Sequence, residues 1–99
     1  MHARRPVSYR IRYSDEAKRI LAMLPGRYRQ RARRMIEELA RNPQPAHAEQ
    51  LRDYPPGVFR VWLNGWRIIY QVNDEAGILW IAAIRLKTGP ETYEGLDVE

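Results

Sequence analysis

Two arginines and a tryptophan stand close together in the stretch VFRVWLNGWRIIYQVNDE, in the middle of the chain. Arg60 and Arg67 could clamp a phosphate group, because a guanidinium presents a planar fork of donors that matches phosphate oxygens. Trp62, or Tyr93 further along the chain, could stack on an unpaired base. Alternatively, Trp62 shields its strand and the aliphatic stems of the arginines pack over it. These residue types therefore indicate either a nucleic acid site or a solvated surface.

The Asn64-Gly65 pair decides which of these side chains meet. Asn-Gly between two alternating runs predicts a β-hairpin with a two-residue type I′ turn. This turn sets the register, in which the facing pairs are Leu63 with Trp66, Trp62 with Arg67, Val61 with Ile68, and Arg60 with Ile69. One face of the hairpin is then apolar and belongs to the core; it carries Phe59, Val61, Leu63, Trp66, Ile68 and Tyr70. The other face gathers Arg60, Trp62 and Arg67 within cross-strand reach.

Other kinds of chemistry have weaker support in the sequence. The chain has no cysteine, which excludes a disulfide framework and a thiolate metal site. His2 and His47 have no partner at the spacing of metal ligands, so we expect neither a metal nor a cofactor. There is no Gly-rich phosphate loop and no nucleophile motif. Acidic residues could pair for acid–base work, although on a basic surface they are more often counter-charges; they are Glu37, Glu38, Glu91 and Glu94.

Composition favours a single domain with an anionic partner. The chain has 99 residues, which suffice for one domain over residues 1–99, and 44% of them are hydrophobic. Its net charge is +5, and of its 17 basic residues only Lys18 and Lys87 are lysine. A polyanionic partner or an arginine-biased coding preference would explain this bias. Because the sequence has no signal-peptide pattern and no window that approaches a membrane span, we expect a cytoplasmic protein with no membrane partner.

The first half of the chain predicts one strand and two helices. Residues 7–13 alternate between apolar and polar types, as a half-buried strand does. Ser14 is a suitable N-cap for a first helix, which Pro25-Gly26 ends. In a second helix, over about residues 27–41, apolar residues recur every three or four positions and the outer face is rich in arginine. The Pro-rich stretch that follows, up to Gly57, shows no periodicity.

The second half predicts three strands. After the hairpin, a strand over about residues 78–85 is apolar on both faces, which is typical of a central strand, but its register stays open. We expect the polar tail from about residue 94 to be partly loose. Strand, helix, helix and then a three-stranded antiparallel meander predict an α+β two-layer domain. Both helices then pack on one face of the sheet and leave the other face, with Arg60, Trp62 and Arg67, concave and basic.

Two segments, LRDYPPGVFRVWLNGWRIIYQVNDE and ILWIAAIRLKTGPETY, together resemble the RelE/ParE superfamily of bacterial toxin–antitoxin systems. The shared features are the Leu51-Arg52 pair, the strand around Arg60, the segment GWRIIYQV, and a basic residue followed by a tyrosine after the last strand. The resemblance extends from Tyr9 to about Leu96, and it implies a RelE-like fold and a cognate antitoxin as partner. RelE-type members are ribosome-dependent endoribonucleases, which cut mRNA with a cluster of basic residues and a C-terminal tyrosine.

Carried over by position, the resemblance implies a role for each candidate residue. Arg67 matches an arginine that steadies the phosphate, and Arg60 matches one of two basic positions on the preceding strand. Trp62 stands at the other position, where the family has lysine, and this departure leaves the general base open. Lys87 matches a proposed general acid, and Tyr93 matches a residue that stacks on or orients the RNA. The catalytic candidates are therefore Arg60, Arg67, Lys87 and Tyr93, and the substrate-binding candidates are Trp62, Arg85 and Glu91.

Three functions agree with this resemblance. The first is a RelE-like endoribonuclease that cleaves ribosome-bound mRNA through 2′-OH attack, without a metal, and so inhibits translation. The second is a ParE-like toxin that inhibits DNA gyrase and cleaves nothing. The third is a relic that only binds its antitoxin or RNA. Lys87 and Tyr93 favour the nuclease, whereas the missing strand lysine at Trp62 favours the gyrase inhibitor.

Overall fold

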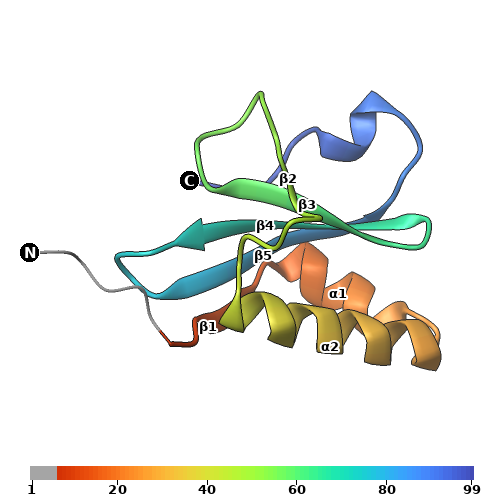
Figure 1. The fold of residues 1–99 in the computed structure, drawn as a ribbon. Coiled ribbons are helices and arrows are strands. Elements are labelled where there is room, and N and C mark those ends of the chain that lie inside the picture. Colours follow the sequence, from red (N-terminus) through yellow and green to blue (C-terminus); the bar gives the residue numbers. More distant parts are fainter. Residues whose placement is uncertain (1–6) are drawn as a thin grey trace, which may run out of the picture.

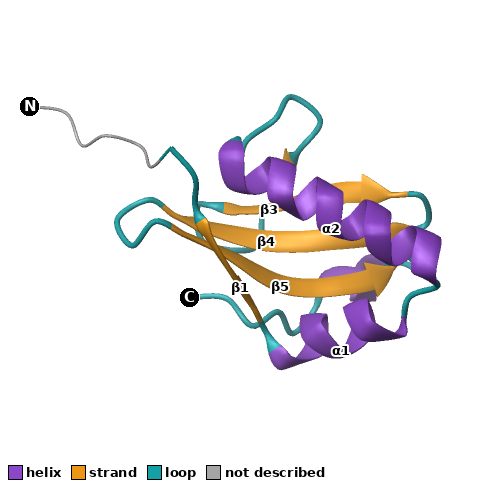
Figure 2. Cartoon of the chain, turned by 90° about the horizontal axis from the view of Figure 1, so that it is seen from below, coloured by secondary structure: helices purple, strands orange, loops and turns teal. Residues whose placement is uncertain are grey.

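Two helices cover one face of a five-stranded sheet in the computed structural model, which describes residues 7–99 (Figure 1, Figure 2). In chain order the elements are β1 (Arg10–Tyr13), α1 (Asp15–Met23), α2 (Gly26–Arg41), β2 (Glu49–Gln50), β3 (Val58–Leu63), β4 (Trp66–Asn73), β5 (Ile78–Leu86) and the 3₁₀ helix η1 (Pro90–Tyr93). This arrangement confirms the predicted α+β two-layer fold. Within residues 7–99, neither α-helix has the length and apolar character needed to cross a membrane.

The sheet order is β1-β5-β4-β3-β2, with β1 parallel to β5 and all other neighbours antiparallel. The predicted meander of β3, β4 and β5 is confirmed, and so is the central position of β5. The predicted hairpin register is also confirmed, from the Leu63–Trp66 pair to the Arg60–Ile69 pair. Asn64 has a φ of 53°, but Gly65 lies outside the positive-φ region. The turn therefore departs from the predicted type I′ geometry at its second central residue.

The main core fills the space between the helices and the sheet. The Ser14 hydroxyl accepts a hydrogen bond from the Ala17 N–H at 3.0 Å, so Ser14 caps α1 as predicted. α2 presents a buried stripe to the sheet, which consists of Ala32, Ile36, Leu39 and Ala40. The six core-side residues predicted for the hairpin all pack in this cluster. Apolar burial between the two layers thus fixes which face of the hairpin points away from the helices.

A β-bulge interrupts the pairing between β4 and β5. Ile69 pairs with Ala83, whereas the next residue, Tyr70, pairs with Ile81, so Ala82 has no partner on β4. Side chains alternate between the two faces of a strand, and an extra residue shifts that alternation by one position. The bulge therefore reverses the face that each later residue of β5 would otherwise take.

The reversal moves Arg85 to the helix-free face. Ile81 before the bulge and Ile84 after it both pack in the core under the helices. Arg85 then lies opposite Arg67 of β4, on the other face. The Ser14 hydroxyl donates to the Ala82 carbonyl at 2.6 Å, so the bulge is hydrogen bonded to the start of α1.

The helix-free face is partly covered rather than open. A second apolar cluster lies on it, with Leu51, Val58, Ile69 and Ala83 buried and with Tyr54, Tyr93, Leu96 and Val98 packed against them. In Figure 1 the loop after β2 and the C-terminal segment lie on the opposite side of the sheet from the helices. The sequence did not predict this cover on the face expected to be concave and basic, which forms because these segments bury their apolar side chains on it.

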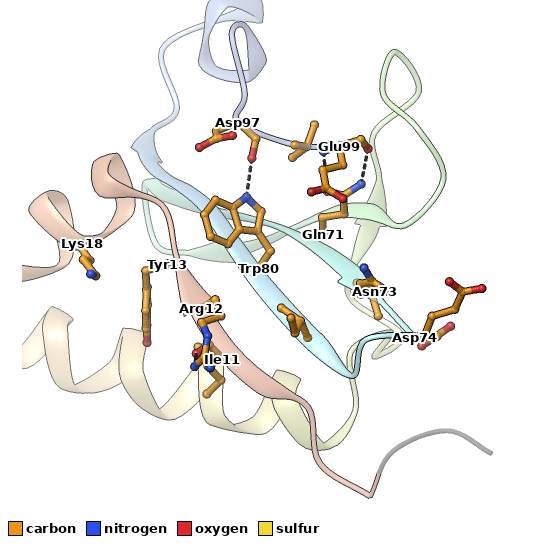
Figure 3. Close-up of a pocket in the computed structure, with 14 residues that line it drawn as sticks. Ile11, Arg12, Tyr13, Lys18, Gln71, Asn73, Asp74, Trp80, Asp97 and Glu99 are labelled. Atoms are coloured by element: carbon orange, nitrogen blue, oxygen red, sulfur yellow. Dashed lines mark hydrogen bonds between the residues drawn. The ribbon is translucent and has the colours of Figure 1, made fainter. Parts of the chain in front are cut away.

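Two further segments differ from the sequence-based expectation. The predicted loose tail is instead hydrogen bonded to the sheet: Trp80 donates to the Asp97 carbonyl at 2.5 Å, and Gln71 exchanges two hydrogen bonds with the Glu99 backbone at 2.6 and 2.9 Å (Figure 3). The Pro-rich stretch contains β2, which pairs with Arg60 and Phe59 of β3. A strand of two residues is too short to show an alternating pattern.

Replacement of Ser14 by alanine should destabilise the fold. The side chain is 3% exposed, and the change removes both the helix cap and the partner of the Ala82 carbonyl. We expect a loss of about 1–3 kcal/mol in the free energy of unfolding, measured by urea denaturation. Ser8→Ala, at an exposed position, is the matched control and should change the free energy by less than about 0.5 kcal/mol. Equal effects of the two changes would contradict this role of Ser14.

Candidate active site

Four of the predicted site residues lie close together on the helix-free face. Trp62 on β3 faces Arg67 on β4, which in turn faces Arg85 on β5. Arg60 lies two residues before Trp62 on the same face of β3, so about 7 Å separates their Cα atoms. Side chains from three adjacent strands therefore meet at the hairpin end of this face.

Arg67 lies over the ring of Trp62. Its guanidinium carbon is 4.6 Å from the ring centroid, which is the geometry of a cation–π contact. Its Nη1 donates to the carbonyl oxygens of Asn64 at 3.1 Å and Trp66 at 3.0 Å, while its Nε is buried without a partner in the protein. Trp62 itself is 55% exposed, so part of its ring remains accessible to a ligand.

Arg60 lies over the ring of Tyr93. The guanidinium carbon is 4.7 Å from the ring centroid, and Nη2 is 3.3 Å from a carboxylate oxygen of Glu49 on β2. Arg60 and Tyr93 line a groove. One side of the groove is β2 with the loop that follows it, and the other side is residues 90–95. The Glu49 side chain is 52% exposed, so solvent screens its contact with Arg60. Arg60 thus lines the groove with a positive charge that Glu49 compensates only weakly.

Three buried polar side-chain atoms in residues 7–99 have no hydrogen-bond partner: Nε of Arg60, Nε of Arg67 and the hydroxyl of Tyr93. Most buried polar groups in folded proteins are paired, so each unpaired one requires an explanation, such as a catalytic role. All three atoms belong to residues that the sequence analysis selected as catalytic candidates. They lie on the same face of the sheet.

Lys87 lies in the loop that joins β5 to η1, Glu91 lies in η1, and both are exposed. The Lys87 backbone N–H donates to the Gly65 carbonyl at 2.9 Å, which keeps this residue next to the hairpin turn. The Glu91 carboxylate accepts a hydrogen bond from the Thr88 hydroxyl at 2.8 Å. Hydrogen bonds from its own backbone N–H and from Thr88, with a smaller effect of the Lys87 charge, lower the pKa of Glu91. A carboxylate with a lowered pKa is a weaker base.

Arg85 is held by protein groups on two sides. Its Nε and Nη2 donate to the two carboxylate oxygens of Glu16 at 2.7 and 2.9 Å. Its Nη1 donates to the carbonyls of Thr92 at 3.1 Å and Glu94 at 2.5 Å. The hydrogen bonds between the two side chains raise the pKa of Arg85 and lower that of Glu16, against the effect of burial. Since a guanidinium has five N–H donors, Arg85 has little capacity left for a substrate.

Three neighbours of this site were not identified from the sequence. Tyr54 donates its hydroxyl hydrogen to the Tyr93 carbonyl at 2.5 Å, Glu49 contacts Arg60, and Glu16 pairs with Arg85. The only available signal was the length of the Pro-rich stretch around Tyr54, because a long loop without periodicity is often functional. Nothing local distinguishes the two glutamates from other surface carboxylates.

A second pocket lies at the β1 edge of the sheet and contains none of the predicted site residues (Figure 3). Its walls include Arg12 and Tyr13 of β1, Lys18 of α1, Trp80 of β5 and the tail. Within residues 7–99 no three His, Cys, Asp or Glu side chains gather in a group that could hold a metal ion. His2 lies outside the described residues.

The fold is shared with solved structures of RelE toxins. The RelBE2 toxin–antitoxin complex from Mycobacterium tuberculosis is 25% identical with a TM-score of 0.70, covering 84% of this chain and 95% of that one. The isolated RelE toxin of E. coli is 22% identical with a TM-score of 0.73, covering 87% and 92%. The archaeal RelE–RelB complex from Pyrococcus horikoshii is 21% identical with a TM-score of 0.71, covering 80% and 94%. These similarities show that the chain has the RelE fold.

Comparison of sequences identifies the family. No similar protein was found among curated protein sequences. Residues 7–87 match the family model of the ParE toxin of the type II toxin–antitoxin system parDE. The matched range runs from before β1 to just past β5, and thus contains Arg60 and Arg67 but ends before Tyr93. Because the match covers most of the chain, this protein belongs to the ParE toxin family of type II toxin–antitoxin systems, within the RelE/ParE superfamily.

Proposed function

We propose that this protein is a RelE-like endoribonuclease, which cleaves mRNA on the ribosome and so inhibits translation. The observation that carries the proposal is the set of unpaired buried atoms on Arg60, Arg67 and Tyr93. A phosphodiester supplies oxygen acceptors for guanidinium and hydroxyl donors alike. The exposed ring of Trp62, next to Arg67, supplies a surface on which a base can stack.

The cleavage of RNA through its own 2′-OH group requires positive charge near the phosphate, which arginine supplies. The 2′ oxygen of the RNA attacks the adjacent phosphorus, a 2′,3′-cyclic phosphate forms, and the bond to the 5′ oxygen breaks. This reaction needs alignment and stabilisation of the additional negative charge on phosphorus, but no outside nucleophile. Arg67 holds the scissile phosphate, and Arg60 helps to neutralise it. A guanidinium is not deprotonated in proteins, so these two residues supply positive charge rather than transfer protons.

Proton transfer requires other groups. Lys87 donates a proton to the departing 5′ oxygen, because an ammonium can release a proton whereas a guanidinium is not deprotonated in proteins. Tyr93 positions the RNA in the groove that it shares with Arg60. Glu91 is a poor general base, since its pKa is lowered. A neutral phenol cannot hold a second proton, so the proton of the 2′-OH leaves to a group of the ribosome or of the RNA rather than to Tyr93.

The second part of the proposal is a cognate antitoxin. Five arginines of α2 are exposed and make no ion pair in the described part of the chain; they are Arg27, Arg31, Arg33, Arg34 and Arg41. Together with the helix-free face they form two basic surfaces. An acidic segment that orders on binding would neutralise them. Solved RelE structures from several organisms are complexes with antitoxins, which agrees with such a partner.

A ParE-like inhibitor of DNA gyrase is the alternative. The family match carries the ParE name. Trp62 stands at a position where the resemblance to RelE-type nucleases implies a lysine. In this alternative the row of arginines and aromatic rings contacts gyrase, and Lys87 has no proton to transfer.

Purification of the tagged protein from its native host should yield a tight complex with a small acidic protein. We expect the affinity-tagged toxin to co-purify with that partner through a salt wash, because apolar contacts join the charge pairs as the segment orders. The measurement is size-exclusion chromatography with mass spectrometry. Recovery of the tagged protein alone from its native host would contradict the proposal of a cognate antitoxin.

Induced expression without the antitoxin should stop translation before it affects DNA. We expect incorporation of labelled amino acids to fall first, with plasmid supercoiling and chromosome integrity unchanged at that time. Cleaved mRNA should carry 2′,3′-cyclic phosphate and 5′-hydroxyl ends, and EDTA should not prevent cleavage where ribosomes remain intact. Gyrase-trapped DNA breaks with undisturbed mRNA would support the ParE-like alternative instead.

Arg67→Ala should abolish growth arrest and leave the fold intact, because the side chain lies off the core face. The expected loss in cleavage rate is about 10²–10³-fold, the scale known for removal of one charge-stabilising donor. Arg34→Ala on the exposed face of α2 removes the same charge away from the site, and it should leave the rate nearly unchanged.

Two further variants divide the roles within the site. Lys87→Ala should be about as damaging as Arg67→Ala, whereas Tyr93→Phe should be milder if Tyr93 acts by stacking. Circular dichroism of each variant controls for folding. A double variant with Arg67→Ala and Lys87→Ala that is as toxic as the wild type would rule out this site assignment.

A further inference from the structure

Three consecutive backbone carbonyls around Tyr93 are held by side chains from elsewhere in the fold. Nη1 of Arg85 donates to the carbonyls of Thr92 at 3.1 Å and Glu94 at 2.5 Å. The hydroxyl of Tyr54 donates to the carbonyl of Tyr93 itself at 2.5 Å. The segment on both sides of the candidate tyrosine is thus tied to β5 and to the loop after β2.

The segment has few backbone hydrogen bonds of its own, and its other internal support comes from the Thr92 hydroxyl, which accepts from the N–H groups of Thr88 at 2.9 Å and Gly89 at 3.3 Å. η1 is a single 3₁₀ turn over Pro90–Tyr93. Its backbone hydrogen bonds include Thr92 N–H to the Gly89 carbonyl and Glu94 N–H to the Glu91 carbonyl, each at 3.1 Å. One helical turn is unstable on its own, because few hydrogen bonds offset the entropy of ordering it. The contacts from Tyr54 and Arg85 therefore fix this segment.

Both holding residues are themselves fixed. Glu16 of α1 binds Arg85 with both carboxylate oxygens, a bidentate pair with defined geometry. The Tyr54 ring packs against the apolar cluster of the helix-free face. The Leu96 N–H donates to the Tyr54 hydroxyl at 3.4 Å. This hydroxyl therefore forms hydrogen bonds with both ends of the Tyr93–Leu96 segment.

We propose that Tyr54 and Arg85 are positioning residues, which hold the Tyr93 ring against the guanidinium of Arg60, 4.7 Å away. The inference rests on the proposed function for what Tyr93 then does to RNA. It assigns Arg85 a different role from substrate binding, because four of its donor hydrogens are engaged by Glu16 and the two carbonyls. It also links the start of α1 to the active site, through Glu16.

The Tyr54→Phe variant tests this role with the smallest change, since it removes one oxygen and keeps the packed ring. We expect kcat for cleavage of ribosome-bound mRNA to fall by about 10–100-fold, because a misplacement of about 1 Å has such effects, while KM changes by less than about twofold. Tyr28→Phe on α2 is the matched control and should leave kcat unchanged. A Tyr54→Phe enzyme with wild-type kcat would overturn the proposal.

A double-mutant cycle separates positioning from a general loss of stability. If Tyr54 acts through Tyr93, Tyr54→Phe should reduce the rate by less than about twofold in a Tyr93→Ala background. Independent effects that multiply in the double variant would overturn the proposal. Arg85→Gln is a less clean probe, because it leaves the Glu16 carboxylate unpaired.

Hydrogen exchange of the purified full chain gives a readout that does not depend on activity. The Glu94 and Leu96 amides should exchange about 10-fold faster in Tyr54→Phe than in the wild type, with the amides of β4 unchanged. Unchanged exchange at these two amides would overturn the proposal. If the wild type leaves ribosome-bound mRNA intact, the nuclease proposal fails, and the exchange data alone decide whether Tyr54 holds Tyr93.

Discussion

One β-bulge, at Ala82, decides which residues share the helix-free face. Without it, alternation along β5 would carry Arg85 to the same side as Ile81 and bury a guanidinium under the helices, at a high desolvation cost. The Ala82 carbonyl accepts a hydrogen bond from Ser14, and the same hydroxyl caps α1. The position of α1 and the set of residues on the helix-free face therefore both depend on the hydrogen bonds of the Ser14 hydroxyl. Bulges are known to redirect side chains beside active sites in this way.

The helix-free face carries Arg60, Arg67 and Arg85, and their positive charges are neutralised to different degrees. Arg67 and Arg85 face each other directly, which is unfavourable for like charges. Arg85 is neutralised by Glu16 through two hydrogen bonds. Arg60 has one contact of 3.3 Å with the half-exposed Glu49 and otherwise lies, like Arg67, over an aromatic ring. A cation–π contact contributes only about 0.5–1 kcal/mol at an exposed site and leaves the charge uncancelled. The two arginines with unpaired Nε atoms are thus also the two that remain electrostatically available to an anion.

Much of the fold could be predicted from the sequence, because it follows from local rules. Ser14 identified the start of α1, and Asn64-Gly65 fixed the hairpin register even though the turn geometry differs in detail. β2 and the ordered tail could not be predicted, since both form only against a sheet that already exists. Leu96 bears no periodic relation to its neighbours, and it is partly buried because the helix-free face offers an apolar patch.

The same distinction applies to the site. Arg60, Trp62 and Arg67 lie on one hairpin, so their convergence could be derived from two residues of turn sequence. In the sequence, however, Arg85 looks as suitable for phosphate binding as Arg67. What separates them is a carboxylate 69 residues away, which reaches Arg85 only because the bulge turns it toward the start of α1. The abundance of arginine in the sequence therefore does not distinguish these residues, whereas the carboxylates placed by the fold determine which guanidinium groups keep unpaired donors.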